Sequence, residues 1–244
     1  MYLIETPAPH SGTLGLAAIL SLGFLLGIRH ATDADHVVAV STIVSRERRL
    51  RGAALIGALW GAGHTLTILA VGAGIILFSL VIPPRLGLSM EFSVGLMLVA
   101  LGLVNLYALR QPAPPAHTHA NLDSLDRTFG HWSLYQWLRP LVVGLVHGLA
   151  GSAAVALLVL TTLRDPHWAV AYLFLFGIGT IAGMMLITVI MASALHFAGA
   201  RSSWINARLS IATGVLSVAF GSFILYQMGF VHGLFTANPT WTPQ

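Results

Sequence analysis

The chain has 244 residues, of which 56% are hydrophobic and only 8% are charged, and its formal net charge is +4. Soluble domains carry about 25% charged residues, so this composition excludes an ordinary soluble protein and predicts a single transmembrane domain over residues 1–244. All twelve basic residues are arginines, with no interleaved aromatic residues for base stacking, so we expect no nucleic-acid partner. The absence of cysteine excludes disulfides, thiolate ligands and thiol redox chemistry.

The first apolar run is too long for one ordinary membrane span. Residues 14–44 are apolar except for the stretch His30–His36, which reads His-Ala-Thr-Asp-Ala-Asp-His. One straight helix of this length would span about 47 Å, whereas the hydrocarbon core of a bilayer is about 30 Å thick. We therefore expect a first helix that is broken at this stretch. The run crosses the membrane either once or twice.

Five further apolar spans follow along the chain. They are predicted over residues 53–82, 92–109, 141–163, 169–197 and 209–230. The one long polar segment, residues 110–139, contains prolines and histidines and is expected to be a loop. Arginines concentrate here and in the loops at 46–51 and 201–208, so the positive-inside rule places these three loops in the cytoplasm. The sequence predicts an all-α polytopic membrane protein of about six transmembrane helices.

The two halves of the chain share a sequence pattern. Gly-x-x-His at His30 recurs at His147, 117 residues later, and further glycine pairs recur in the same order at offsets of 116 to 119. We therefore expect a three-helix repeat, with copies at residues 12–109 and 140–230. Because three crossings are an odd number, the second copy would be inverted in the membrane. Inverted 3+3 repeats with broken helices are typical of secondary transporters.

Ionisable side chains inside these apolar segments are candidates for metal binding. Each costs about 2.5–3.5 kcal/mol on membrane-insertion scales, so such residues are usually functional. Imidazole together with carboxylate suits late first-row divalent ions such as Ni²⁺, Co²⁺, Cu²⁺ and Zn²⁺. The candidate metal ligands are His30, Asp33, Asp35, His36, His64 and His147.

The helical spacing of these residues leaves alternatives open. On an intact helix Asp33 shares a face with both flanking histidines, whereas Asp35 points elsewhere unless the helix unwinds. The first motif could instead be a proton relay or a buried polar network with Arg29. His64 could be a packing histidine, and His147 could line the pathway without ligating the ion.

These motifs resemble a known transporter family. The stretch His30–His36 resembles the His-x4-Asp-His motif of the nickel/cobalt transporter family (NiCoT), and Gly63-His64-Thr65 looks like the Gly-His-Ser/Thr motif of its next helix. The chain is shorter than typical members, and its second half lacks their acidic motif. Residues 146–153 look instead like the short urease-accessory nickel permeases, relatives in the LysE-type transporter superfamily.

The resemblance implies uptake of Ni²⁺, and also of Co²⁺, by a secondary transporter in the bacterial cytoplasmic (inner) membrane. The partners would be the divalent ion, the lipid bilayer and a cytoplasmic nickel acceptor such as a urease or hydrogenase maturation protein. His30, Asp35 and His36 would be essential, with Asp33 and His64 in support. The chain would not be an enzyme. Two alternatives remain, namely a metal or small-solute exporter of the same superfamily and a membrane enzyme that uses a bound metal.

Overall fold

The computed structural model describes residues 10–45, 47, 50–109, 132–150, 163, 165–201 and 203–241. Every regular element in these residues is helical, which confirms the all-α prediction for them. The helices are α1 (His10–His30), α2 (Ala34–Val44), α3 (Leu50–Phe78), α4 (Pro84–Leu109), α6 (Trp132–His147), α8 (Pro166–Arg201), α9 (Ser203–Tyr226) and the π-helical turn η1 (Gln227–Val231).

Four of the described helical segments are long and apolar enough to cross a membrane. They are Leu50–Phe78, Pro84–Leu109, Pro166–Phe197 and Ala207–Val231. Shorter apolar helices are found at Ala17–His30, Ala34–Val44 and Leu138–His147. This set is compatible with a membrane protein. The count of six spans stays a prediction, because residues 110–131 of the predicted loop and residues 151–162 of the predicted span at 141–163 lie outside the described residues.

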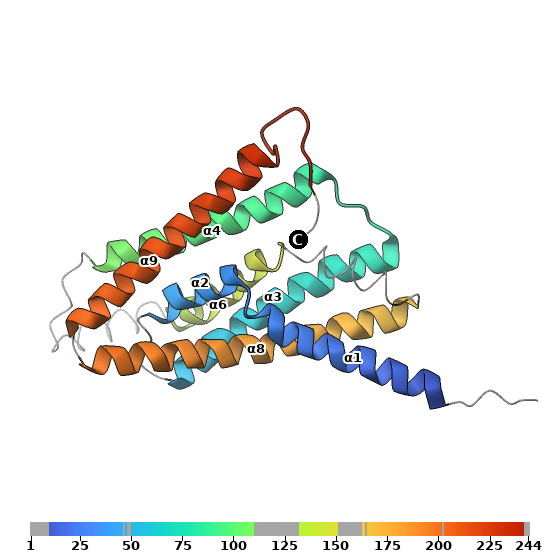
Figure 1. The fold of residues 1–244 in the computed structure, drawn as a ribbon, viewed down its shortest axis with the longest axis horizontal. Coiled ribbons are helices and arrows are strands. Elements are labelled where there is room, and N and C mark those ends of the chain that lie inside the picture. Colours follow the sequence, from blue (N-terminus) through green and yellow to red (C-terminus); the bar gives the residue numbers. More distant parts are fainter. Residues whose placement is uncertain are drawn as a thin grey trace, which may run out of the picture.

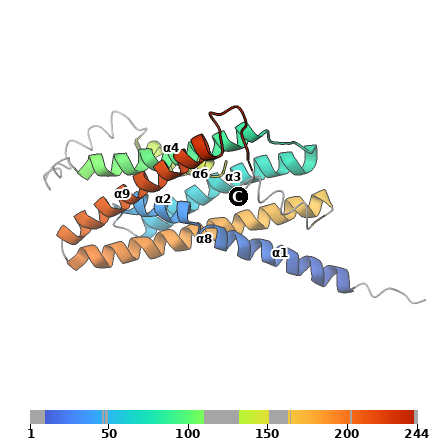
Figure 2. The same cartoon turned by 45° about the horizontal axis from the view of Figure 1, so that its top comes forward.

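The long helices form two pairs with short helices between them. α4 and α9 lie side by side on one side of the molecule, and α3 and α8 on the other (Figure 1). α2 and α6 lie between these pairs in Figure 1, α2 also lies between α9 and α8 in Figure 2, and α1 runs along α8. The break between α1 and α2 is therefore placed near the centre of the bundle.

Glycines determine how closely the long helices approach. A side chain at Gly95 would meet the carbonyl of Gly221, and one at Gly102 would meet the carbonyl of Gly214 at 2.7 Å. Successive contacts run in opposite directions along the two helices, so α4 and α9 are antiparallel. Small residues at such crossings let backbones pack together within a membrane.

The recurring Gly-x-x-His motif makes matching contacts in the two halves. Gly27 of α1 faces the carbonyl of Phe176 on α8, and Gly144 of α6 faces the carbonyl of Trp60 on α3. In both places a Cβ would overlap backbone atoms, so neither position accepts a larger residue without movement of a helix. The two short helices that end at the histidines are thus each held against a long helix of the other half.

The first apolar run is broken where its length predicts a break. α1 ends at His30, and α2 begins at Ala34 after a short turn. Thr32 closes this turn, since both its backbone amide and its hydroxyl donate to the carbonyl of Arg29, at 2.8 and 2.6 Å. Asp33 has an extended backbone and its carbonyl accepts the first hydrogen bond of α2 from Val37. The break therefore places Asp35 in the first turn of α2 and not in the register of α1.

Two helix boundaries differ from the sequence prediction. α4 begins at Pro84 and not at residue 92, because proline needs no amide partner in the first turn and the carbonyl of Pro83 accepts from the amides of Leu86 and Gly87. α6 begins at Trp132, so the end of the segment expected to be a loop at 110–139 is helical. Polar composition alone does not identify a loop, because a helix can carry polar residues on one side.

A buried polar side chain links α4 to α9. Asn105 is 4% exposed, and its Nδ2 donates to the carbonyl of Ser210 at 2.9 Å, which is a hydrogen bond between the two helices. We expect Asn105→Ala to lower the free energy of unfolding by about 0.6–1.7 kcal/mol, the usual range for such bonds in membranes. Chemical unfolding in detergent measures this loss. Ser93→Ala is the control, because the Ser93 hydroxyl donates to the carbonyl of Met90 within its own helix, and an equal loss in both variants would contradict the assignment.

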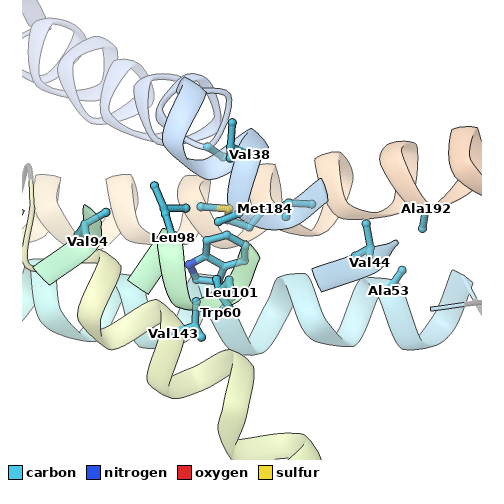
Figure 3. Packing of buried hydrophobic residues seen from close by; sticks show 13 residues of the cluster. Val38, Val44, Ala53, Trp60, Val94, Leu98, Leu101, Val143, Met184 and Ala192 are labelled. Carbon is cyan, nitrogen blue, oxygen red and sulfur yellow. The ribbon is translucent and has the colours of Figure 1, made fainter. Parts of the chain in front are cut away.

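The main apolar core lies under the broken helix. Trp60 of α3 is fully buried and packs among side chains of α2, α4, α6 and α8 (Figure 3). Its ring stacks on His36 with centroids 6.2 Å apart and an interplanar angle of 21°, and it meets His147 edge-on at 5.6 Å. The buried Trp60 ring therefore packs against two of the predicted metal ligands.

Candidate metal site

The six predicted metal ligands lie together at one place in the bundle. They come from the end of α1, the turn after it, the start of α2, the middle of α3 and the end of α6. The residues are His30, Asp33, Asp35, His36, His64 and His147. Their proximity is a finding of the structure, whereas their role as ligands stays a prediction.

Three histidines form the first group. His30 Nε2 lies 3.0 Å from His64 Nε2, and the ring of His36 is 4.8 Å from that of His30 and 5.0 Å from that of His64. One nitrogen from each ring lies within 4.8 Å of the others. His36 and His64 are buried and His30 is partly buried. A single cation could therefore contact all three imidazoles.

Asp35 joins a second group with His36 and His147. Its Oδ1 lies 3.0 Å from His36 Nδ1 and accepts from the backbone amide of the same residue at 2.9 Å. Its Oδ2 lies 2.9 Å from His147 Nε2. The helix break explains this contact, since Asp35 sits in the first turn of a new helix and not in the register of α1. The sequence did not decide whether the helix unwinds at this point. In the structure it does, and this brings the Asp35 carboxylate into the cluster.

Asp33 has a different environment. It pairs with His30 Nδ1 at 2.8 Å, but its side chain is 53% exposed, against 28% for Asp35. Both carboxylates thus hold a histidine through Nδ1, which leaves the Nε2 atoms of His30 and His36 directed elsewhere. Carboxylates in this position fix the tautomer and orientation of metal-binding histidines.

Three ring nitrogens in the cluster are buried without a hydrogen-bond partner in the described part of the chain. They are His36 Nε2, His64 Nδ1 and His147 Nδ1. A buried polar atom left unpaired costs about 1–3 kcal/mol, and the rings of His36 and His147 are each held by Asp35 through their other nitrogen, as in a metal-binding histidine. Imidazole nitrogens and a carboxylate are the donors that late first-row divalent ions accept.

The alternative of a polar network with Arg29 has no support in the geometry. Arg29 is exposed, and among the described residues the ion pairs of Asp33 and Asp35 are with histidines only. The charge of the two carboxylates is therefore directed at the imidazole cluster.

A cavity of about 510 Å³ opens onto the cluster. His30, Asp33, Asp35, His36 and His147 line it together with apolar side chains of α4 and α9. Its wall also includes three polar residues that the sequence did not predict for a site, namely Glu91, Gln227 and His232. One signal was available in the sequence, because Glu91 is one of only eight acidic residues and directly precedes a predicted span.

A curated relative matches almost the whole chain. Urease accessory protein UreH of Bacillus sp. (strain TB-90) is 37% identical over 220 residues, which cover 90% of this chain and 96% of UreH. The chain belongs to the UreH family. This membership agrees with the predicted resemblance to urease-accessory-type proteins. The wider NiCoT and LysE-type placements stay predictions.

Two plant proteins are more distant relatives of this UreH-family chain. The chloroplast proteins FOR GROWTH AND FERTILITY 2 and 1 of Arabidopsis thaliana are 26% and 24% identical over 220 and 227 residues. Each match covers 87% of this chain but only 57% and 60% of the plant proteins. No family model matches the chain, and no solved structure matches it.

Proposed function

We propose that this UreH-family protein is a secondary transporter that carries Ni²⁺, and also Co²⁺, into the bacterial cytoplasm. The observation that carries the proposal is the pair of ligand groups that share His36 at a broken helix inside an apolar bundle. The family name adds a urease-accessory role, and such a role implies nickel. The cytoplasmic acceptor would then be a urease or hydrogenase maturation protein.

The donor set favours nickel over alkaline-earth ions. Mg²⁺ and Ca²⁺ take oxygen ligands, whereas this cluster offers mainly imidazole nitrogens. Two nitrogens bound at about 2.0–2.1 Å on adjacent corners of a square or octahedron lie about 2.9 Å apart. The 3.0 Å between His30 Nε2 and His64 Nε2 is a hydrogen-bond distance between the two rings, and an ion bound by both nitrogens would replace that contact with little movement. Square-planar or tetragonal nitrogen and oxygen sites are typical of Ni²⁺ and Cu²⁺.

Helix directions support an inverted-repeat mechanism. α4 and α9 are equivalent in the predicted repeat and run antiparallel, and the contacts of Gly57 with Met184 and of Gly177 with Thr65 make α3 and α8 antiparallel as well. Five of the six candidate ligands belong to residues 12–109, and His147 belongs to residues 140–230. Rocking of one repeat against the other would separate His147 from Asp35 and change the second ligand group, as alternating access requires.

A flux measurement tests the proposed function. We expect purified protein in proteoliposomes to accumulate ⁶³Ni²⁺ saturably, with competition by Co²⁺ and none by Mg²⁺, because the ligands are imidazole nitrogens. Protein-free vesicles are the control. Flux outward only would favour an exporter, and turnover of a substrate without net flux would favour a metal-dependent enzyme. No flux of any divalent ion in either direction would contradict the proposal.

A further inference from the structure

The cavity contains a second group of potential ligands away from the histidine cluster. Glu91 of α4 is half-buried, lines the cavity and accepts a hydrogen bond at Oε1 from Trp241 Nε1 at 2.8 Å. This bond orients the carboxylate and occupies only one of its two oxygens. The ring of Trp241 packs against Gly87, which lies one turn before Glu91 in α4. A side chain at position 87 would overlap this ring.

The segment after α9 brings an imidazole to the same cavity. His232 follows η1, its amide donates to the carbonyl of Gln227 at 2.8 Å, and its own carbonyl accepts from Thr240 at 3.0 Å. These bonds fold residues 232–241 back toward the start of α4 (Figure 1). The side chains of His232 and Gln227 line the same cavity as Glu91.

We propose that Glu91, His232 and Gln227 form a second binding site for a divalent transition-metal ion, which the ion occupies before it reaches the His30–His36–His64 group. The inference rests on the proposed function. A carboxylate, an imidazole and an amide oxygen are suitable ligands, and all three residues are half-buried, so water can complete the coordination. With one nitrogen in place of three, this site binds the ion more weakly than the histidine group.

The position of the second site gives it a use in transport. Apolar residues make up most of the remaining cavity wall, namely Ala34, Val94, Ala150, Phe220, Phe223, Ile224 and Met228. The predicted topology puts the start of α4 and the end of α9 outside, so an incoming ion meets Glu91 and His232 first. Conduction of ions needs sites that bind well enough to admit an ion and weakly enough to release it. A half-buried outer site would remove part of the hydration shell before the ion reaches the buried histidines.

Metal binding by the full-length protein in detergent tests this inference, with Ni²⁺ alone as the probe. We expect equilibrium dialysis with ⁶³Ni²⁺ to detect one tightly bound and one weakly bound ion in the wild type. The double variant Glu91→Gln/His232→Gln should lose only the weakly bound ion. In proteoliposomes the same variant should raise KM for Ni²⁺ by about tenfold or more with Vmax nearly unchanged, since capture and not translocation is impaired. Retention of the tight ion shows that the variant is folded.

Matched controls and a conservative change complete the experiment. Glu47→Gln and His196→Gln remove the same groups outside the cavity and should change neither binding nor KM. Glu91→Asp keeps the charge and should retain the weak ion. A wild type that binds one tight ion, with an unchanged KM in the double variant, would overturn this inference alone. A wild type that binds no Ni²⁺ would overturn the proposed function, so the two failures are distinguishable.

Discussion

Replacing His36 with alanine is expected to abolish both tight Ni²⁺ binding and Ni²⁺ uptake. His36 is the residue shared by the two ligand groups, its Nε2 is buried without a partner in the described residues, and its Nδ1 is held by Asp35. Its loss removes a ligand from each group. Since changes to residues that merely support a metal ligand already cost about 10–100-fold in affinity, we expect a loss of more than about 100-fold here. Equilibrium dialysis and proteoliposome uptake with ⁶³Ni²⁺ measure both effects.

Two further variants separate a lost ligand from a damaged fold. His196→Ala removes an exposed histidine of α8 and should leave binding unchanged. His64→Ala removes a ligand of the first group from a different helix and should cause a similar loss, because His64 Nε2 is 3.0 Å from His30 Nε2. Unchanged uptake by the His36→Ala variant, if this variant elutes from size exclusion at the same volume as the wild type, would contradict the assignment of the metal site.

Asp35→Asn is expected to weaken Ni²⁺ binding by about 10–100-fold without loss of the fold, as for other carboxylates that orient metal-bound histidines. The side chain keeps its shape, but it loses its charge and one of its two acceptor oxygens. Asp35 holds His36 through Oδ1 and His147 through Oδ2, so an amide can satisfy only one of them as an acceptor. Titration of the purified variant with Ni²⁺ gives the affinity directly.

Asp33→Asn provides the matched comparison for this prediction. Asp33 is mostly exposed and contacts one histidine, at 2.8 Å from His30 Nδ1. Water can replace part of that contact, so the loss in affinity should be clearly smaller than in Asp35→Asn. Equal losses in the two variants would contradict the distinct roles assigned to the two carboxylates.

Much of the site could be predicted from the sequence because charges are rare in apolar segments. Only Asp33 and Asp35 among the acidic residues lie within the first apolar run, and the length of that run requires a break near them. The structure places the break at residues 31–33 and brings His64 and His147 to it. Helical spacing alone predicted that Asp33 shares a face with both of its neighbouring histidines. In the structure the turn is unwound, and His36 pairs with Asp35 instead.

The sequence was less informative wherever the outcome depends on contacts between distant segments. The predicted span began only at residue 92 because Pro83 and Pro84 follow an apolar run, although proline is equally suited to the first turn of a helix. His232 had no local signal of a binding role. Its place in the cavity depends on the fold of the segment after η1, which Trp241 and Thr240 hold in place.

The amino-acid sequence by itself determined the class of the protein, the broken first helix and the chemical type of its site. These features follow from local properties, namely hydropathy, segment length and the high cost of an ionisable group in hydrocarbon. Only the tertiary structure decided which carboxylate holds which imidazole and that one cavity joins Glu91 and His232 to the histidine cluster. The contact of Asp35 with His147 and the cavity shared by Glu91 and His232 each join residues more than 100 positions apart, and the glycines that allow the helices to cross do not reveal their partners in the sequence.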